Sequence, residues 1–161
     1  MSGLVKTSPI PEVIARIEEN GGAVLDPEEA VIDQAAGVAL ARTLGHRRIA
    51  VTTAVAAEAA AIREQFPETV IVAVHTTGIS REDAALMAGA ADLLTACASK
   101  HIREEAAKAA LLQAGTSIPV FAMTRAGKAI VLGKVLETDQ PFIIHGAHLP
   151  VPGSQSPEPL C

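Results

Sequence analysis

Short apolar runs alternate with longer helical repeats through most of the chain. A continuous β-branched run at residues 70–74 is typical of a strand covered on both faces. The apolar spacing predicts further strands at residues 48–53, 92–95 and 118–123, and helices at residues 55–66, 80–91, 99–114 and 125–137. Strands that alternate with helices of this length form βαβ units. The sequence therefore predicts an α/β three-layer sandwich, with helices on both faces of a mainly parallel, Rossmann-like or flavodoxin-like sheet.

The two ends of the chain are less regular. A helix with apolar positions three and four residues apart ends at Asn20-Gly21-Gly22, and residues 23–25 predict a short strand. Asp26 is expected to cap a helix that runs to Leu44, with Asp33 either on its exposed side or bonded to a neighbouring loop. Pro119 is tolerated best on an edge strand, and residues 142–144 predict a last strand. We expect one domain over residues 1–149 and a Pro-rich irregular tail over residues 150–161.

Composition excludes several classes of function. The chain has 161 residues, 2% aromatic residues and a net charge of −5, so a nucleic-acid surface is not expected. The one basic cluster, His46-Arg47-Arg48, is interpreted as a solvated turn between a helix and a strand. No apolar run is long enough to span a membrane, and no secretory signal pattern is found, so we expect a cytoplasmic protein without a membrane partner.

Two segments that follow predicted strands carry most of the candidate chemistry. They are residues 75–80 (His-Thr-Thr-Gly-Ile-Ser) and residues 95–101 (Thr-Ala-Cys-Ala-Ser-Lys-His). In open parallel sheets ligands bind beyond the carboxyl ends of the strands, where both segments would meet. Polar residues at the other expected strand exits should gather at the same edge: Asp26, Thr52, Thr53, Thr124 and His145.

A small anionic ligand fits these two segments best. Glycine lets a backbone approach closely, hydroxyl groups donate hydrogen bonds, and helix amino termini favour negative charge. The predicted ligand-binding residues are Thr76, Thr77, Gly78, Ser80, Ser99 and Lys100. The chain has no dinucleotide-binding glycine motif, no Walker lysine loop and no serine-hydrolase elbow, so its cofactor and reaction stay unknown.

Cys97, His75 and His101 are the candidate catalytic residues, and each has a structural alternative. Cys97 lies beside a predicted helix amino terminus, which favours a thiolate, but a free cysteine is also a common buried apolar residue. His75 could be a core histidine bonded to a backbone carbonyl. Together with His145 these residues could supply zinc or iron ligands, yet their spacing matches no metal motif, and no metal is assigned. Cys161 is interpreted as an exposed tail residue.

Several sequence segments resemble the methanogenesis marker protein 8 family of methanogenic archaea. They are residues 1–10, 32–37, 73–80, 95–101, 111–119 and 156–160. Members of that family are longer and carry another cysteine-containing segment before the matched part. The resemblance implies that this chain is a carboxyl-terminal domain or a shortened relative. It also implies an association with methanogenesis, with no established reaction to transfer.

Two classes of function stay open from the sequence. One is a domain that binds a small molecule or cofactor through residues 75–80 and 95–101. The other is a non-catalytic assembly or interaction module that serves the maturation of methanogenic machinery. The sequence also leaves open a homo-oligomer and an amino-terminal domain outside this chain.

Overall fold

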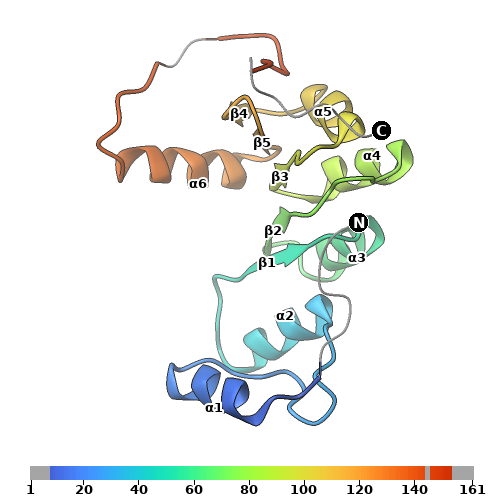
Figure 1. Cartoon of the computed structure of the whole chain (residues 1–161), viewed down its shortest axis with the longest axis vertical. Helices are drawn as coiled ribbons and strands as arrows, with labels where there is room; N and C mark the ends of the chain where they lie inside the picture. Colours follow the sequence, from blue (N-terminus) through green and yellow to red (C-terminus); the bar gives the residue numbers. More distant parts are fainter. Residues whose placement is uncertain (1–7, 144–145, 154–161) are drawn as a thin grey trace.

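The computed structural model describes residues 8–143 and 146–153, which form a five-stranded sheet flanked by helices (Figure 1). The strands are β1 (Ala50–Thr53), β2 (Val70–Ala73), β3 (Leu93–Thr95), β4 (Leu112–Ala114) and β5 (Val120–Ala122). The helices are α1 (Pro11–Glu19), α2 (Gln34–Thr43), α3 (Ala56–Gln65), α4 (Arg81–Ala90), α5 (Lys100–Ala107) and α6 (Arg125–Leu136). The predicted α/β class with a three-layer arrangement is confirmed.

The strands lie in the order β1-β2-β3-β5-β4. β1, β2 and β3 are parallel, with Thr53 opposite Ala73 and Ala73 opposite Leu94. β5 is antiparallel to β3 and to β4. Residues 70–74 thus contribute an internal strand with parallel neighbours on both sides, as the uninterrupted apolar run predicts.

Helices α3, α4 and α5 cover one face of the sheet, and α6 lies on the other (Figure 1). The covered face packs Ile71, Leu94 and Phe121 against Ile62, Met87 and other fully buried apolar residues of the helices. On the other face, Gly127 of α6 contacts the start of β3 so closely that an added Cβ would lie 2.1 Å from the backbone oxygen of Asp92. Next to β1 and β2 the described residues cover this second face less completely, with Thr52 exposed and Val72 half-buried.

A buried carboxylate joins the layers at the amino end of β3. Asp92 is 4% exposed and accepts hydrogen bonds from the Arg63 guanidinium at 2.6 Å and from the backbone N–H of Ile71 at 2.8 Å. Its other oxygen accepts a hydrogen bond from the hydroxyl of Thr124, which also caps α6. Asp92 therefore ties α3, β2 and the start of α6 together.

Residues 23–44 differ from the sequence prediction. Residues 23–25 form no strand, and the predicted helix over residues 26–44 is divided in two. Asp26 caps a single turn through the N–H groups of Glu28 and Glu29, after which Ala30 adopts a positive φ of 53°. Helix α2 then starts afresh because the Asp33 side chain accepts a hydrogen bond from Ala36, so Asp33 is a cap instead of an exposed mid-helix residue.

Residues 108–124 hold the second difference. The predicted helix over residues 99–114 ends at Ala107, and β4 follows it because its backbone pairs with β5. Gly115, the residue after that predicted helix, lies between the two strands with a φ of 76°. β5 is consequently internal, and Pro119 precedes an internal strand instead of an edge strand. Thr124 also moves to the amino edge of the sheet, because β5 runs opposite to β3.

The last expected strand does not form within the described residues. Phe142 and Ile143 are in neither a helix nor a strand, and Ile144 lies outside the described residues. Residues 150–153 are in neither a helix nor a strand, and Val151 is hydrogen-bonded through both its N–H and its carbonyl to the side-chain amide of Gln113.

Candidate site at the carboxyl edge of the sheet

The two predicted loops meet at the carboxyl ends of β2 and β3. The buried hydroxyl of Thr76 donates to the backbone carbonyl of Thr95 at 2.7 Å. The backbone N–H of Ala98 donates to the hydroxyl of Thr77 at 3.4 Å. The side chains expected to bind a ligand therefore join the loops to each other. The Thr76 hydroxyl in particular donates its hydrogen bond within the protein.

A pocket of about 400 Å³ opens beside the first of these loops. Part of its wall is the loop itself, through the predicted residues His75, Thr77, Gly78 and Ser80. The opposite wall is the end of β1 and the first turn of α3: Ala54, Val55, Ala56 and Ala57. The pocket thus lies between the exits of two adjacent parallel strands, where ligands of α/β sheets bind.

The first turn of α3 presents free backbone donors to this pocket. No side chain caps α3 at Val55, and the N–H groups of Ala56 and Ala57 have no acceptor in the described part of the chain. Ala57 is exposed, whereas Ala56 is 4% exposed, and both line the pocket. A helix amino terminus of this kind carries unpaired N–H groups and about half a positive charge. It can therefore accept an anionic group.

One carboxylate lies on the other side of the same pocket, and a second lies in the first turn of α3 outside the pocket lining. Asp83 in the first turn of α4 lines it, and Ser80 caps that helix by accepting a hydrogen bond from the Asp83 N–H at 3.1 Å. At the start of α3, the Glu58 carboxylate accepts a hydrogen bond from the buried hydroxyl of Thr53. The pocket therefore combines backbone donors with an acidic acceptor.

Both loops contain a residue in the left-handed conformation. His75 has a φ of 54° and Cys97 a φ of 48°, and each follows its strand by two residues. A side chain at positive φ costs roughly 1–2 kcal/mol, and such strain occurs often at functional sites. Here it places the exposed residue His75 in the wall of the pocket.

The second loop contributes less than predicted. Ser99 is fully buried and caps α5 by accepting a hydrogen bond from Ile102 at 3.2 Å. Lys100 is exposed, 3.8 Å from a Glu104 oxygen, and His101 is half-buried with its Nδ1 4.0 Å from the same carboxylate. Cys97 is a half-buried free thiol whose backbone carbonyl accepts a hydrogen bond from Arg103 at 3.2 Å. None of these four residues lines the pocket.

The described residues include no group of three or more His, Cys, Asp or Glu side chains arranged to hold a metal ion. His145 and Cys161 lie outside the described residues. No described helix has the length and apolar content needed to cross a membrane.

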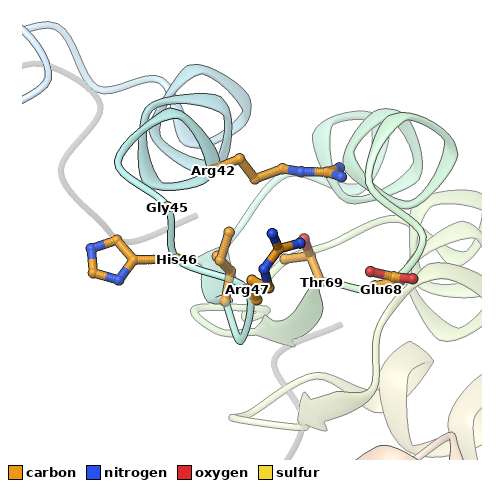
Figure 2. Close-up of a pocket in the computed structure, with 7 residues that line it drawn as sticks. Arg42, Gly45, His46, Arg47, Glu68 and Thr69 are labelled. Atoms are coloured by element: carbon orange, nitrogen blue, oxygen red, sulfur yellow. The ribbon is translucent and has the colours of Figure 1, made fainter.

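Sequence reasoning missed a second pocket, at the amino edge of the sheet. It has a volume of about 280 Å³ and is lined by residues around the end of α2 and the starts of β1 and β2: Arg42, Gly45, His46, Arg47, Ile49, Glu68 and Thr69 (Figure 2). The basic cluster was interpreted from the sequence as a solvated turn. Arg42 and Thr69, distant in sequence, complete the pocket only after folding.

Comparison with known proteins places the chain in a family. The model of a family described as an uncharacterized protein conserved in archaea (DUF2099) matches residues 1–136. The chain belongs to this archaeal family. A relative, the uncharacterized protein MJ0054 of Methanocaldococcus jannaschii, is 38% identical over 163 residues, which cover 99% of this chain. Those residues span 57% of the relative, so this chain corresponds to somewhat more than half of that protein. No solved structure matches the chain.

Proposed function

We propose that this DUF2099 domain binds a small anionic ligand in the carboxyl-edge pocket. The observation that carries the proposal is the uncapped first turn of α3 facing the His75 loop across about 400 Å³. A phosphate or carboxylate would accept hydrogen bonds from the N–H groups of Ala56 and Ala57. The imidazole of His75 and the hydroxyl of Thr77 are additional donors on the facing wall.

Asp83 defines the other end of the proposed ligand. A carboxylate disfavours a second negative group nearby, but it accepts hydrogen bonds from a hydroxyl or ammonium group. The ligand would therefore be a small molecule with an anionic group at α3 and a donor group at Asp83. Aromatic stacking cannot contribute, because the chain has three Phe and no Trp or Tyr.

Isothermal calorimetry with inorganic phosphate, small hydroxycarboxylates and amino acids tests this function. Ala57→Asp places a carboxylate among the free N–H groups of α3. It should abolish binding while leaving the fold intact, because an acidic residue is stabilising in the first turn of a helix. Ala57→Asn is the matched control without charge, and it should weaken binding far less. Equal affinities for both variants, or no heat with any anion, would refute the site.

The family relationship supports a role in methanogenic archaea. The M. jannaschii relative and the resemblance to the methanogenesis marker protein 8 family agree on this setting. We therefore propose that the domain acts in the cytoplasm, in association with methanogenesis, with the bound ligand either converted or sensed. Loss of methane production after deletion of the gene in a methanogen, restored by the native gene but not by the Ala57→Asp form, would support the association.

A second candidate function is an interaction module, and α1 favours it. None of the residues of α1 is buried, and its apolar side chains Val13 and Ile17 are 50% and 42% exposed. An unpartnered apolar helix face of this kind marks a surface for association. Val13→Asp combined with Ile17→Asp would change the oligomeric state in light scattering if α1 joins two copies of the chain. An unchanged monomer would leave the ligand-binding function as the proposal.

A further inference from the structure

The amino-edge pocket lies at the amino ends of β1 and β2, opposite the carboxyl-edge pocket at the other ends of these strands. Helix α2 ends above it, where the N–H of Gly45 donates to the carbonyl of Arg42 at 3.0 Å and Gly45 has a φ of 89°. The chain then turns through His46 and Arg47 into β1. The segment before β2 closes the pocket from the other side through Glu68 and Thr69.

Two guanidinium groups face this pocket without an ion-pair partner. No carboxylate in the described part of the chain lies within ion-pair distance of Arg42 or Arg47. Arg42 is held in place by the Phe66 ring, with the guanidinium carbon 5.6 Å from the ring centre. Figure 2 shows both arginines extending towards the side of Thr69, whereas the His46 ring points away. This local excess of positive charge contrasts with the net charge of −5 of the whole chain.

Thr69 supplies a buried polar group that points to a ligand. The residue is 5% exposed and lines the pocket, and its hydroxyl has no hydrogen-bond partner within the described residues. The hydroxyl oxygen itself keeps some contact with solvent. Its backbone is fixed on both sides, because its N–H donates to Phe66 at 3.0 Å and its carbonyl accepts from Arg63 at 3.1 Å. Such a hydroxyl needs a partner, which is either water or a ligand. A group bound in the pocket would provide one.

We propose that the amino-edge pocket binds the phosphate group of a small phosphorylated molecule. Guanidinium groups bind phosphate oxygens with strong, charge-assisted hydrogen bonds. Arg42 and Arg47 would neutralise the phosphate, and the Thr69 hydroxyl would donate to a third oxygen. Glu68, on the rim, repels a bare phosphate but accepts hydrogen bonds from hydroxyl groups on the remainder of the ligand. The volume of about 280 Å³ suits a phosphorylated polyol or sugar.

Three arginine variants test this site by calorimetry at low ionic strength, with inorganic phosphate and a sugar phosphate as probes. Arg42→Ala and Arg47→Ala should each weaken binding about tenfold, the range for loss of a charged hydrogen bond. Arg48→Ala is the matched control, because it removes the same charge from the same turn but does not line the pocket. It should change affinity less than threefold. Glu68→Gln should strengthen the binding of inorganic phosphate.

The outcomes separate this site from the carboxyl-edge pocket. Phosphate binding here should shift the amide resonances of Gly45 and Thr69, and the Ala57→Asp variant should leave that binding unchanged. Shifts confined to Gly78 and the start of α3 would locate the phosphate at the other pocket and refute this proposal. Equal losses in all three arginine variants would show nonspecific attraction and would refute it as well. So would the absence of binding at millimolar phosphate by a protein whose circular dichroism confirms the fold.

Discussion

At the scale of single residues, variants of His75 can measure the effect of backbone strain on stability separately from the role of the side chain in the proposed site. His75 is exposed and has no hydrogen-bond partner in the described structure, so its side chain does not compensate for the positive φ. Replacement by glycine removes the steric clash of Cβ, whereas replacement by alanine keeps it. His75→Gly should therefore raise the free energy of unfolding by about 0.5–1 kcal/mol relative to His75→Ala, measured by urea denaturation. A less stable glycine variant would show that the local conformation is not strained.

The imidazole of His75 should nevertheless contribute to the affinity for the ligand. If the carboxyl-edge pocket binds an anion, both His75→Gly and His75→Ala should bind it more weakly than the native protein, even where stability increases. Calorimetry with the tightest-binding anion of the panel measures this. Native-like affinity in both variants would remove His75 from the site.

Asp92 is the residue on which the packing of three elements depends. Asp92→Ala leaves the Arg63 guanidinium and the N–H of Ile71 without their acceptor. Breaking a buried charge pair in this way costs about 3–5 kcal/mol, which thermal denaturation would detect. The control is Asp139→Ala, an exposed carboxylate with no ion pair in the described structure, whose effect should stay within about 0.5 kcal/mol. A small effect at Asp92 would contradict the proposed role.

At the scale of elements, Glu105 connects α4 to α5. The hydrogen bond from Lys108 is the main reason why the pKa of the Glu105 carboxyl is lowered; burial acts in the opposite direction, and the charges of Lys108 and Arg81 add to the lowering. Arg81, at the start of α4, donates to the Glu105 carboxylate at 2.8 Å. The two helices are thus joined by an ion pair that requires ionised Glu105.

This lowered pKa predicts how stability depends on pH. The stabilisation is fully present above the ordinary pKa of glutamate, about 4.3, and is lost as pH falls through the lowered value. The difference in unfolding free energy between the native protein and Glu105→Gln should therefore be constant near neutral pH and shrink below about pH 4.3. Urea denaturation at a series of pH values measures it. A difference that grows on acidification would contradict the assignment.

Local patterns in the sequence predict most of the elements, but not β4 and not all of the boundaries. The predicted helix starts at residues 80 and 99 are confirmed, because Ser80 and Ser99 each cap their own helix. β4 was not predicted, because Ala106 to Ala110 continue a helical pattern and only pairing with β5 ends it. Gly115 could not decide between the two, since a helix end and a hairpin turn both favour a positive φ.

The candidate sites, too, could be predicted from the sequence only in part. Residues 75–80 reach a pocket because the end of a parallel strand fixes their position, as expected from the sequence. Thr76 and Ser99 were expected to bind a ligand, but both are buried and hydrogen-bonded within the protein. Their burial depends on how the two loops pack together, which residue types alone do not reveal. The amino-edge pocket was missed because Arg42, Arg47 and Thr69 are brought together only by the fold.

At the scale of the whole molecule, the amino-terminal helix contributes little to the core. Val13 and Ile17 are exposed, whereas Ile62 is fully buried between α3 and the sheet. Val13→Ala and Ile17→Ala should each change the free energy of unfolding by less than about 0.5 kcal/mol, whereas Ile62→Ala should cost about 2–5 kcal/mol. Chemical denaturation compares them. A large cost at either exposed position would show that α1 is covered in solution, and would favour the interaction module.

The strand order also has a consequence for biosynthesis. Because β1, β2 and β3 are neighbours in both sequence and space, each strand can pair with its predecessor as soon as it leaves the ribosome, without waiting for distant parts of the chain. Contacts between strands that are consecutive along the chain cost less loop-closure entropy than contacts between more distant segments. Only β4 must remain unpaired until β5 has been made, and Asp92 gains its last partner when Thr124 follows. The order of translation thus matches an order of assembly, with the hairpin and α6 completing a sheet already built on β1, β2 and β3.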